Sequence, residues 1–134
     1  MARTVRATMV IEGLEVGAGG VVKAGDLVGF SGGKLIPAVG TAVLYTPARG
    51  VALTSGEGGE LVAMALRGEV SGLSGLPTRG GSVYLSEDAA GGISGSPAGS
   101  AGGWAQRVGW STDGEAPDGG TSVMVTFQDE GAEV

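Results

Sequence analysis

Residues Gly29 to Gly33 match the G-x-S-x-G pattern that places a nucleophilic serine on a sharp turn between a strand and a helix. That chemistry needs a base to accept the serine proton, usually a histidine, and this chain of 134 residues contains no histidine. Gly32-Gly33 is also a strong signal for a two-residue hairpin turn, after which the chain continues as a strand. We therefore expect a hairpin at these residues and no nucleophile.

Two further patterns, a Ser-Lys pair and a phosphate-binding loop, lack the surrounding residues that their chemistry needs. The only lysines, Lys23 and Lys34, flank glycine turns where solvent should reach them, whereas a Ser-Lys pair needs a desolvated lysine. Gly33-Lys34 is followed by Leu35, while a phosphate-binding loop needs serine or threonine there and a helix afterwards. Neither pattern supports an active site.

Carboxylates remain as candidates for acid–base or metal chemistry. Glu87-Asp88 lies in an expected turn, and Asp113, Glu115 and Asp118 cluster in an expected loop. Paired carboxylates serve glycosidases, and hard cations such as Ca²⁺ favour such oxygens. Solvated acids are the favoured interpretation, with weak Ca²⁺ binding at Asp113–Asp118 as the alternative. We expect no enzyme activity, no cofactor and no metal.

The bulk composition narrows the classes of partner. The net charge is −6 and the pI is about 4.5, so eight basic residues cannot form much of a phosphate-binding stripe, and nucleic acid is not expected. No apolar run could span a bilayer, and the N-terminus lacks the apolar region of a signal peptide, so we expect no membrane partner and synthesis in the cytoplasm. Cysteine and asparagine are absent and arginine outnumbers lysine, which fits a thermophilic source or a GC-rich genome.

Twenty-nine glycines separate short runs of valine, leucine, isoleucine, methionine and alanine. Such punctuation predicts an all-β fold, a compact barrel or jelly-roll-like sandwich of about eight to ten short strands. The only helix expected is a turn near Glu87–Ala90. A lone monomer of this composition would be marginally stable, because glycine costs about 0.5–1 kcal/mol relative to alanine inside a strand.

The chain divides into three parts. Residues 1–19 form an extended N-terminal arm, or a first strand, with a glycine-rich connection. Residues 20–128 form a single β domain, and residues 129–134 form an acidic, solvated tail. Within the domain, residues 21–70 and 77–128 share the order hairpin, proline-containing spacer, strand, loop and longer strand, which indicates an internal duplication.

The alignment of these halves gives specific expectations. Val28 and Phe30 should lie on one face of their strand, as Val83 and Leu85 should on theirs. The longer strands are expected at Glu60–Leu66 and Ser122–Phe127.

The two tryptophans, six residues apart, are expected on one face as core anchors, with a subunit interface as the alternative. The basic N-terminal segment could reach over a neighbouring subunit of this acidic protein, or could be an ordinary frayed terminus. The candidate residues for capsid or inter-subunit contact are Arg3, Val5, Arg6, Met9, Ile11, Trp104 and Trp110.

Several phrases follow one another in an order that resembles the decoration, or cementing, proteins of tailed-bacteriophage capsids. They are Val22-Lys23-Ala24-Gly25-Asp26-Leu27-Val28, Arg67-Gly68-Glu69-Val70-Ser71-Gly72-Leu73, Val83-Tyr84-Leu85-Ser86 with Gly91-Gly92-Ile93-Ser94, and Gln106-Arg107-Val108-Gly109-Trp110. Similar phrases occur in phage fibre and tail modules.

The resemblance implies a homotrimer on the outside of the virion, at three-fold positions, that clamps the major capsid protein and stabilises the expanded shell. In such proteins an N-terminal arm often contacts a neighbour, which corresponds to Thr4–Ile11 here. No catalytic residue is implied. The alternative is a fibre- or tail-associated module that recognises a surface glycan or polymer.

Overall fold

The computed structural model describes residues 4–40, 45–77, 79–87, 89–97, 99, 104–112, 120–126 and 132–133. All regular structure in these ranges is β-strand, so the all-β prediction is confirmed. Fifteen strands are present there, of which seven have only two residues and eight have three or more. The eight longer strands correspond to the eight to ten expected, and the two-residue strands are small additional pairings.

The longer strands supply the main sheet. They are β1 (Thr4–Glu15), β3 (Leu27–Ser31), β4 (Lys34–Pro37), β7 (Gly50–Ala52), β9 (Leu61–Leu76), β10 (Ser82–Leu85), β13 (Arg107–Ser111) and β14 (Gly120–Thr126). The two-residue strands are β2 (Val21–Val22), β5 (Val39–Gly40), β6 (Tyr45–Thr46), β8 (Gly56–Glu57), β11 (Ile93–Ser94), β12 (Trp104–Ala105) and β15 (Ala132–Glu133).

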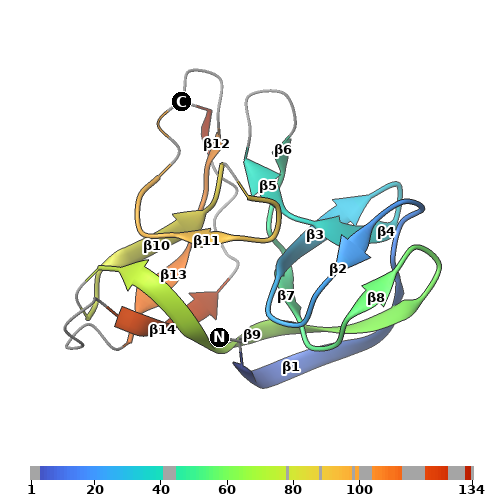
Figure 1. The fold of residues 1–134 in the computed structure, drawn as a ribbon, viewed down its shortest axis with the longest axis horizontal. Coiled ribbons are helices and arrows are strands. Elements are labelled where there is room, and N and C mark those ends of the chain that lie inside the picture. The colour runs from blue at the N-terminus through green and yellow to red at the C-terminus, as the bar shows by residue number, and fades with distance from the viewer. Residues whose placement is uncertain are drawn as a thin grey trace.

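Nine strands form one curled antiparallel sheet, a half-barrel, in the order β11-β10-β13-β14-β9-β7-β3-β4, with β1 paired to the other edge of β9. In Figure 1 the strands of the first half lie on one side of the molecule, those of the second half lie on the other, and β9 runs across both. Three small two-stranded sheets, β2–β8, β5–β6 and β12–β15, complete the described fold.

The two halves of the sheet have the same strand order. From the outside inward, the first half runs β4, β3, β7 and β9, and the second runs β11, β10, β13 and β14. Each therefore consists of a short pairing strand, its antiparallel partner, a second antiparallel strand and a longer strand, and the two longer strands pair antiparallel in the middle. This arrangement matches the order expected from the sequence, while a common origin of the halves remains a prediction.

Strand β1 is an integral part of this sheet. It pairs with β9 from Thr4 opposite Ser71 to Glu15 opposite Leu61, with one irregularity between Ile11 and Leu14. Of the two alternatives left by the sequence, the structure has the first strand and not a detached arm. The ion pair between Lys34 and Glu15, 2.9 Å long, ties the end of β1 to β4.

Two apolar clusters stabilise the sheet, and both consist mainly of valine, leucine and alanine. Alternation along β3 and β7 divides them, because Leu27 and Val51 belong to one cluster and Val28 and Ala52 to the other. Strand β9 contributes to both, with Val70 in the first cluster and Met64 in the second. The first cluster draws on both halves, so the halves share one core.

The hairpin expected at Gly32-Gly33 is confirmed. Strands β3 and β4 pair up to Ser31 opposite Lys34, and Gly32 and Gly33 have φ of 57° and 79°. Positive φ at both central residues is the type I′ geometry that fits the twist of the strands, and only glycine adopts it without steric cost. The G-x-S-x-G pattern is therefore a turn followed by a strand.

Several local expectations are corrected. Strand β9 continues ten residues beyond Leu66, because Gly68 and Gly72 remain within the strand. Phe30 is expected on the same face as Val28, but Val28 is completely buried whereas Phe30 is 41% exposed and does not belong to the core. In the acidic tail, β15 pairs with β12. Asp88 lies outside the described residues, and the described neighbours in the expected turn near Glu87–Ala90 are not helical.

Candidate interaction surface

One row of paired residues crosses the solvent-facing side of the sheet. Arg6 on β1 pairs with Glu69 on β9, Glu69 with Met124 on β14, and Met124 with Trp110 on β13. Directly paired residues in an antiparallel sheet carry their side chains on the same face. Four strands from distant parts of the sequence therefore bring these side chains into one row.

The alternating residues face the core and fix this orientation. Val70 on β9 and Val123 and Val125 on β14 are completely buried in the first cluster. Because side chains alternate along a strand, Glu69 and Met124 must point to the opposite side. The hydrophobic pattern of the inner face thus determines which residues meet solvent.

Two more arginines lie on this side of the sheet. Arg67 is two residues before Glu69 and is exposed. Arg107 is exposed and pairs with Tyr84, which alternates with the buried Val83 and Leu85. We call Arg6, Arg67, Glu69, Arg107, Trp110 and Met124 the outer face. It carries three arginines and one glutamate in a chain whose net charge is −6.

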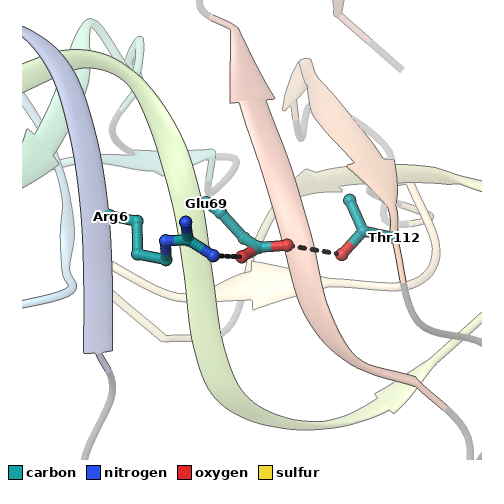
Figure 2. Close-up of polar contacts among 3 residues, drawn as sticks. All are labelled: Arg6, Glu69 and Thr112. Atoms are coloured by element: carbon teal, nitrogen blue, oxygen red, sulfur yellow. Dashed lines mark hydrogen bonds and ion pairs between the residues drawn. The ribbon is translucent and has the colours of Figure 1, made fainter.

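Glu69 is held from both sides (Figure 2). Its Oε1 lies 3.8 Å from Nη1 of Arg6, and the hydroxyl of Thr112 donates a hydrogen bond of 3.1 Å to its Oε2. The Arg6 side chain is 83% exposed, so this ion pair is well solvated and contributes little to stability. Arg67 and Arg107 have no ion pair with any described residue, which leaves two positive charges available on this face.

A surface hollow of about 630 Å³ lies within the outer face, lined by Arg6, Ala7, Arg67, Gly68, Glu69 and Met124. Gly68 has no side chain, and a methyl group built there would lie 2.5 Å from the carbonyl oxygen of Arg6. The glycine therefore permits the close approach of β1 to β9 beside the hollow. Two arginines, Arg6 and Arg67, and the thioether of Met124 line this hollow. The indole of Trp110 lies on the next strand, opposite Met124.

The N-terminal candidate residues are spread over different environments. Val5 is partly buried against the first cluster, and Arg6 belongs to the outer face. Met9 and Ile11 are 65% and 40% exposed along β1. Arg3 lies outside the described residues.

The two tryptophans do not share a face, which corrects the sequence-based expectation. Trp104 is on β12 and Trp110 on β13, and these strands belong to different sheets. Trp104 stacks on Tyr45, with ring centroids 4.4 Å apart and an interplanar angle of 2°. Trp110 is 38% exposed. Neither is one of the buried core residues. The separation follows from a register shift of β13 against β10, where Val83 pairs with Gly109 but Tyr84 pairs with Arg107, so the alternation of faces is interrupted before Trp110.

The structure also adds outer-face residues that sequence reasoning missed, namely Arg67, Glu69, Arg107 and Met124. The strand predicted from the sequence ends at Leu66, so it does not include the alternation of Arg67 and Glu69 with Gly68 and Val70. That alternation is the signal that could have placed them on one face.

The carboxylate candidates can be placed only in part. Asp88 and residues 113–119, with the alternative Ca²⁺ site, lie outside the described residues. Glu87 accepts a hydrogen bond of 2.9 Å from the backbone N–H of Gly99. Within the described ranges no three acidic, histidine or cysteine side chains are grouped to hold a metal ion, and no helix there is long and apolar enough to cross a membrane.

Comparison with protein-family models, with curated proteins and with solved structures gave no match.

Proposed function

We propose that this protein is a structural virion protein without catalytic activity, which binds the outside of a phage capsid as a homotrimer at three-fold positions and stabilises the expanded shell. The ordered phrases that resemble capsid decoration proteins support the phage assignment. The resemblance also suggests that the partner is the major capsid protein.

The outer face is the observation that carries the binding proposal. Tryptophan, methionine and arginine are residue types enriched in protein interfaces, and here an exposed Trp110, a partly buried Met124 and exposed arginines lie on neighbouring strands of one sheet. Three arginines on an acidic protein favour a partner with an acidic surface. A trimer would present this face three times, and such multivalency turns modest contacts into tight attachment.

A binding experiment with purified protein and expanded, undecorated capsids tests the proposal. Trp110→Ser and Arg67→Glu should each weaken binding at least about tenfold, equivalent to about 1.4 kcal/mol. Phe30→Ser is the matched control, because Phe30 is 41% exposed and Trp110 is 38% exposed, but Phe30 lies on the β3–β4 hairpin. Thermal unfolding of each variant should stay close to that of the wild type, since all three positions are exposed.

Three outcomes would contradict parts of the proposal. Absence of capsid binding, together with binding to host cells, would select the fibre or tail module instead. Equal loss for Trp110→Ser and Phe30→Ser would remove the outer face as the contact. A mass of one subunit, 13.0 kDa, at all concentrations in light scattering would contradict the trimer.

A further inference from the structure

Strand β1 presents an open edge to solvent. One edge pairs with β9 along the strand, and the other edge has no strand partner among the described residues. Met9, Val10 and Ile11 are 65%, 45% and 40% exposed on consecutive positions of this strand. A long, apolar edge strand is a ready template for pairing with another strand.

The charges along this edge are arranged symmetrically about Met9. Arg6 lies three residues before Met9 and Glu12 lies three residues after it. Arg3 and Glu15 continue the same spacing in the sequence, six residues on either side. The strand is therefore basic in its first half and acidic in its second half.

This pattern fits a second copy of the same strand. When two β1 strands pair antiparallel with Met9 opposite Met9 of the other copy, Arg6 lies opposite Glu12 and Ala7 lies opposite Ile11. Directly opposed residues of unlike charge stabilise an antiparallel pair, and like charges destabilise it. A parallel pairing in register would place Arg6 beside Arg6, so the charge pattern favours the antiparallel arrangement and one register.

The groups that this pairing needs are available in the single chain. Glu12 is exposed and has no ion pair with any described residue. Arg6 contacts Glu69 only at 3.8 Å with its side chain 83% exposed, so it can turn toward a neighbour. The irregularity in β1 lies between Ile11 and Leu14, so the segment from Arg6 to Ile11 runs in one register with β9, and Glu12 is the first residue after it.

Met9 marks the centre of this segment in a second way. Its φ of 59° is the only positive value among the described non-glycine residues. The left-handed region is strained for a methionine and is not extended, so this one residue departs from regular strand geometry while Thr8 and Val10 on either side keep their pairing with β9. Under the proposed pairing this residue lies on the two-fold axis.

We propose that two copies of this protein associate through antiparallel pairing of their β1 strands across a two-fold axis at Met9. The contact is isologous, since the same segment serves both copies. Backbone hydrogen bonds and burial of Met9, Val10 and Ile11 supply the affinity, and the two Arg6–Glu12 pairs set the register. This self-association goes beyond the proposed function, because two copies can pair in the absence of a capsid. A chain that also forms the proposed trimer would give hexamers, and a chain that does not would give dimers.

Charge exchange tests the register. Sedimentation of the wild type should show even multiples of 13.0 kDa with rising concentration. Arg6→Glu and Glu12→Arg should each weaken association about tenfold or more, because each places like charges opposite one another. The double variant R6E/E12R should restore association, since every pair is again of unlike charge. Glu57→Arg, an equal change of charge on β8, should leave association unaltered.

Cross-linking tests the position of the axis independently. The chain contains no cysteine, so Met9→Cys introduces a single thiol. Opposed residues on paired strands have Cα atoms about 4.5–5.5 Å apart, within the range of a disulfide. Met9→Cys should therefore form a covalent dimer under mild oxidation. Leu61→Cys should not, although Leu61 is 66% exposed and Met9 is 65% exposed.

Either of two results would overturn the proposal. One is equal cross-linking of the Met9 and Leu61 variants in dilute solution. The other is failure of R6E/E12R to recover the association lost by the single variants, with circular dichroism showing that all three are folded. Pairing of β1 with a strand of a different protein would produce the first result.

Discussion

Replacing Gln106 with alanine should lower the free energy of unfolding by about 2–4 kcal/mol, because two buried backbone groups lose their hydrogen-bond partner. Gln106 is completely buried, its Oε1 accepts a 2.7 Å hydrogen bond from the N–H of Ala48, and its Nε2 donates a 3.0 Å hydrogen bond to the carbonyl of Ala48. Ala48 lies between β6 and β7 in the first half of the fold, and Gln106 lies between β12 and β13 in the second. The side chain thus joins the halves inside the fold.

Denaturant unfolding followed by circular dichroism at one fixed protein concentration measures this effect. Arg107→Ala is the control, since Arg107 is the next residue and its side chain is exposed. Gln106→Met separates the hydrogen bonds from the volume of the side chain, and it should cost nearly as much as alanine. A methionine variant as stable as the wild type would show that the two hydrogen bonds contribute little.

Gly109→Ala should destabilise the protein by about 3 kcal/mol or more, because overpacking a site without room to relax costs at least 1–3 kcal/mol. Gly109 lies in the middle of β13, paired with Val83 and with Val125. A methyl group there would overlap the carbonyl oxygen of Met124 and lie 3.0 Å from the Cα of Val125. Both obstacles are backbone atoms of β14, so the strands themselves would have to separate.

The expected decrease in melting temperature is roughly 10 °C or more. Gly99→Ala is the matched control, because its nearest neighbour to an added methyl group is Glu87 Oε1 at 4.0 Å. That variant should stay within about 0.5 kcal/mol of the wild type. Similar melting temperatures for the two variants would show that β13 and β14 can move apart at little cost.

The pairing of β1 with β9 changes what a terminal deletion can reveal. Removing residues 1–12 would expose the edge of β9 from Met64 to Ser71, so a loss of binding could not be separated from a loss of folding. Point substitutions on the exposed edge of β1 and on the outer face avoid this difficulty. They are therefore the informative variants for both proposals.

Local pattern predicted several elements well. The Gly32-Gly33 turn needs only two neighbouring residues, and the alternation of Val83 and Leu85 needs only four, so both could be recognised in the sequence. The same local view failed beyond Leu66, where the predicted strand ends but β9 continues through Gly68 to Leu76. A glycine that makes a turn and one that admits a neighbouring strand look alike until the neighbour is known.

The prediction that the two tryptophans lie on one face was wrong for a related reason. Six residues on one strand would place Trp104 and Trp110 on one face, but β13 has an irregularity between Arg107 and Gly109 where it pairs with β10, and this changes the face of Trp110. The pattern of residues 104–110 alone does not predict where β13 shifts its pairing with β10. The exposed Trp110 and the stacked Trp104 therefore have different environments that only the fold reveals.

The sequence by itself determined the all-β class, the short strands and the similar order of the two halves, because hydrophobic alternation and glycine turns are local properties of the chain. Only the tertiary structure decided that Arg6, Glu69, Met124 and Trp110 form one row, and that β1 has an exposed edge. Strand pairing between distant segments is set by the register and packing of the whole sheet, and a linear pattern does not contain that information.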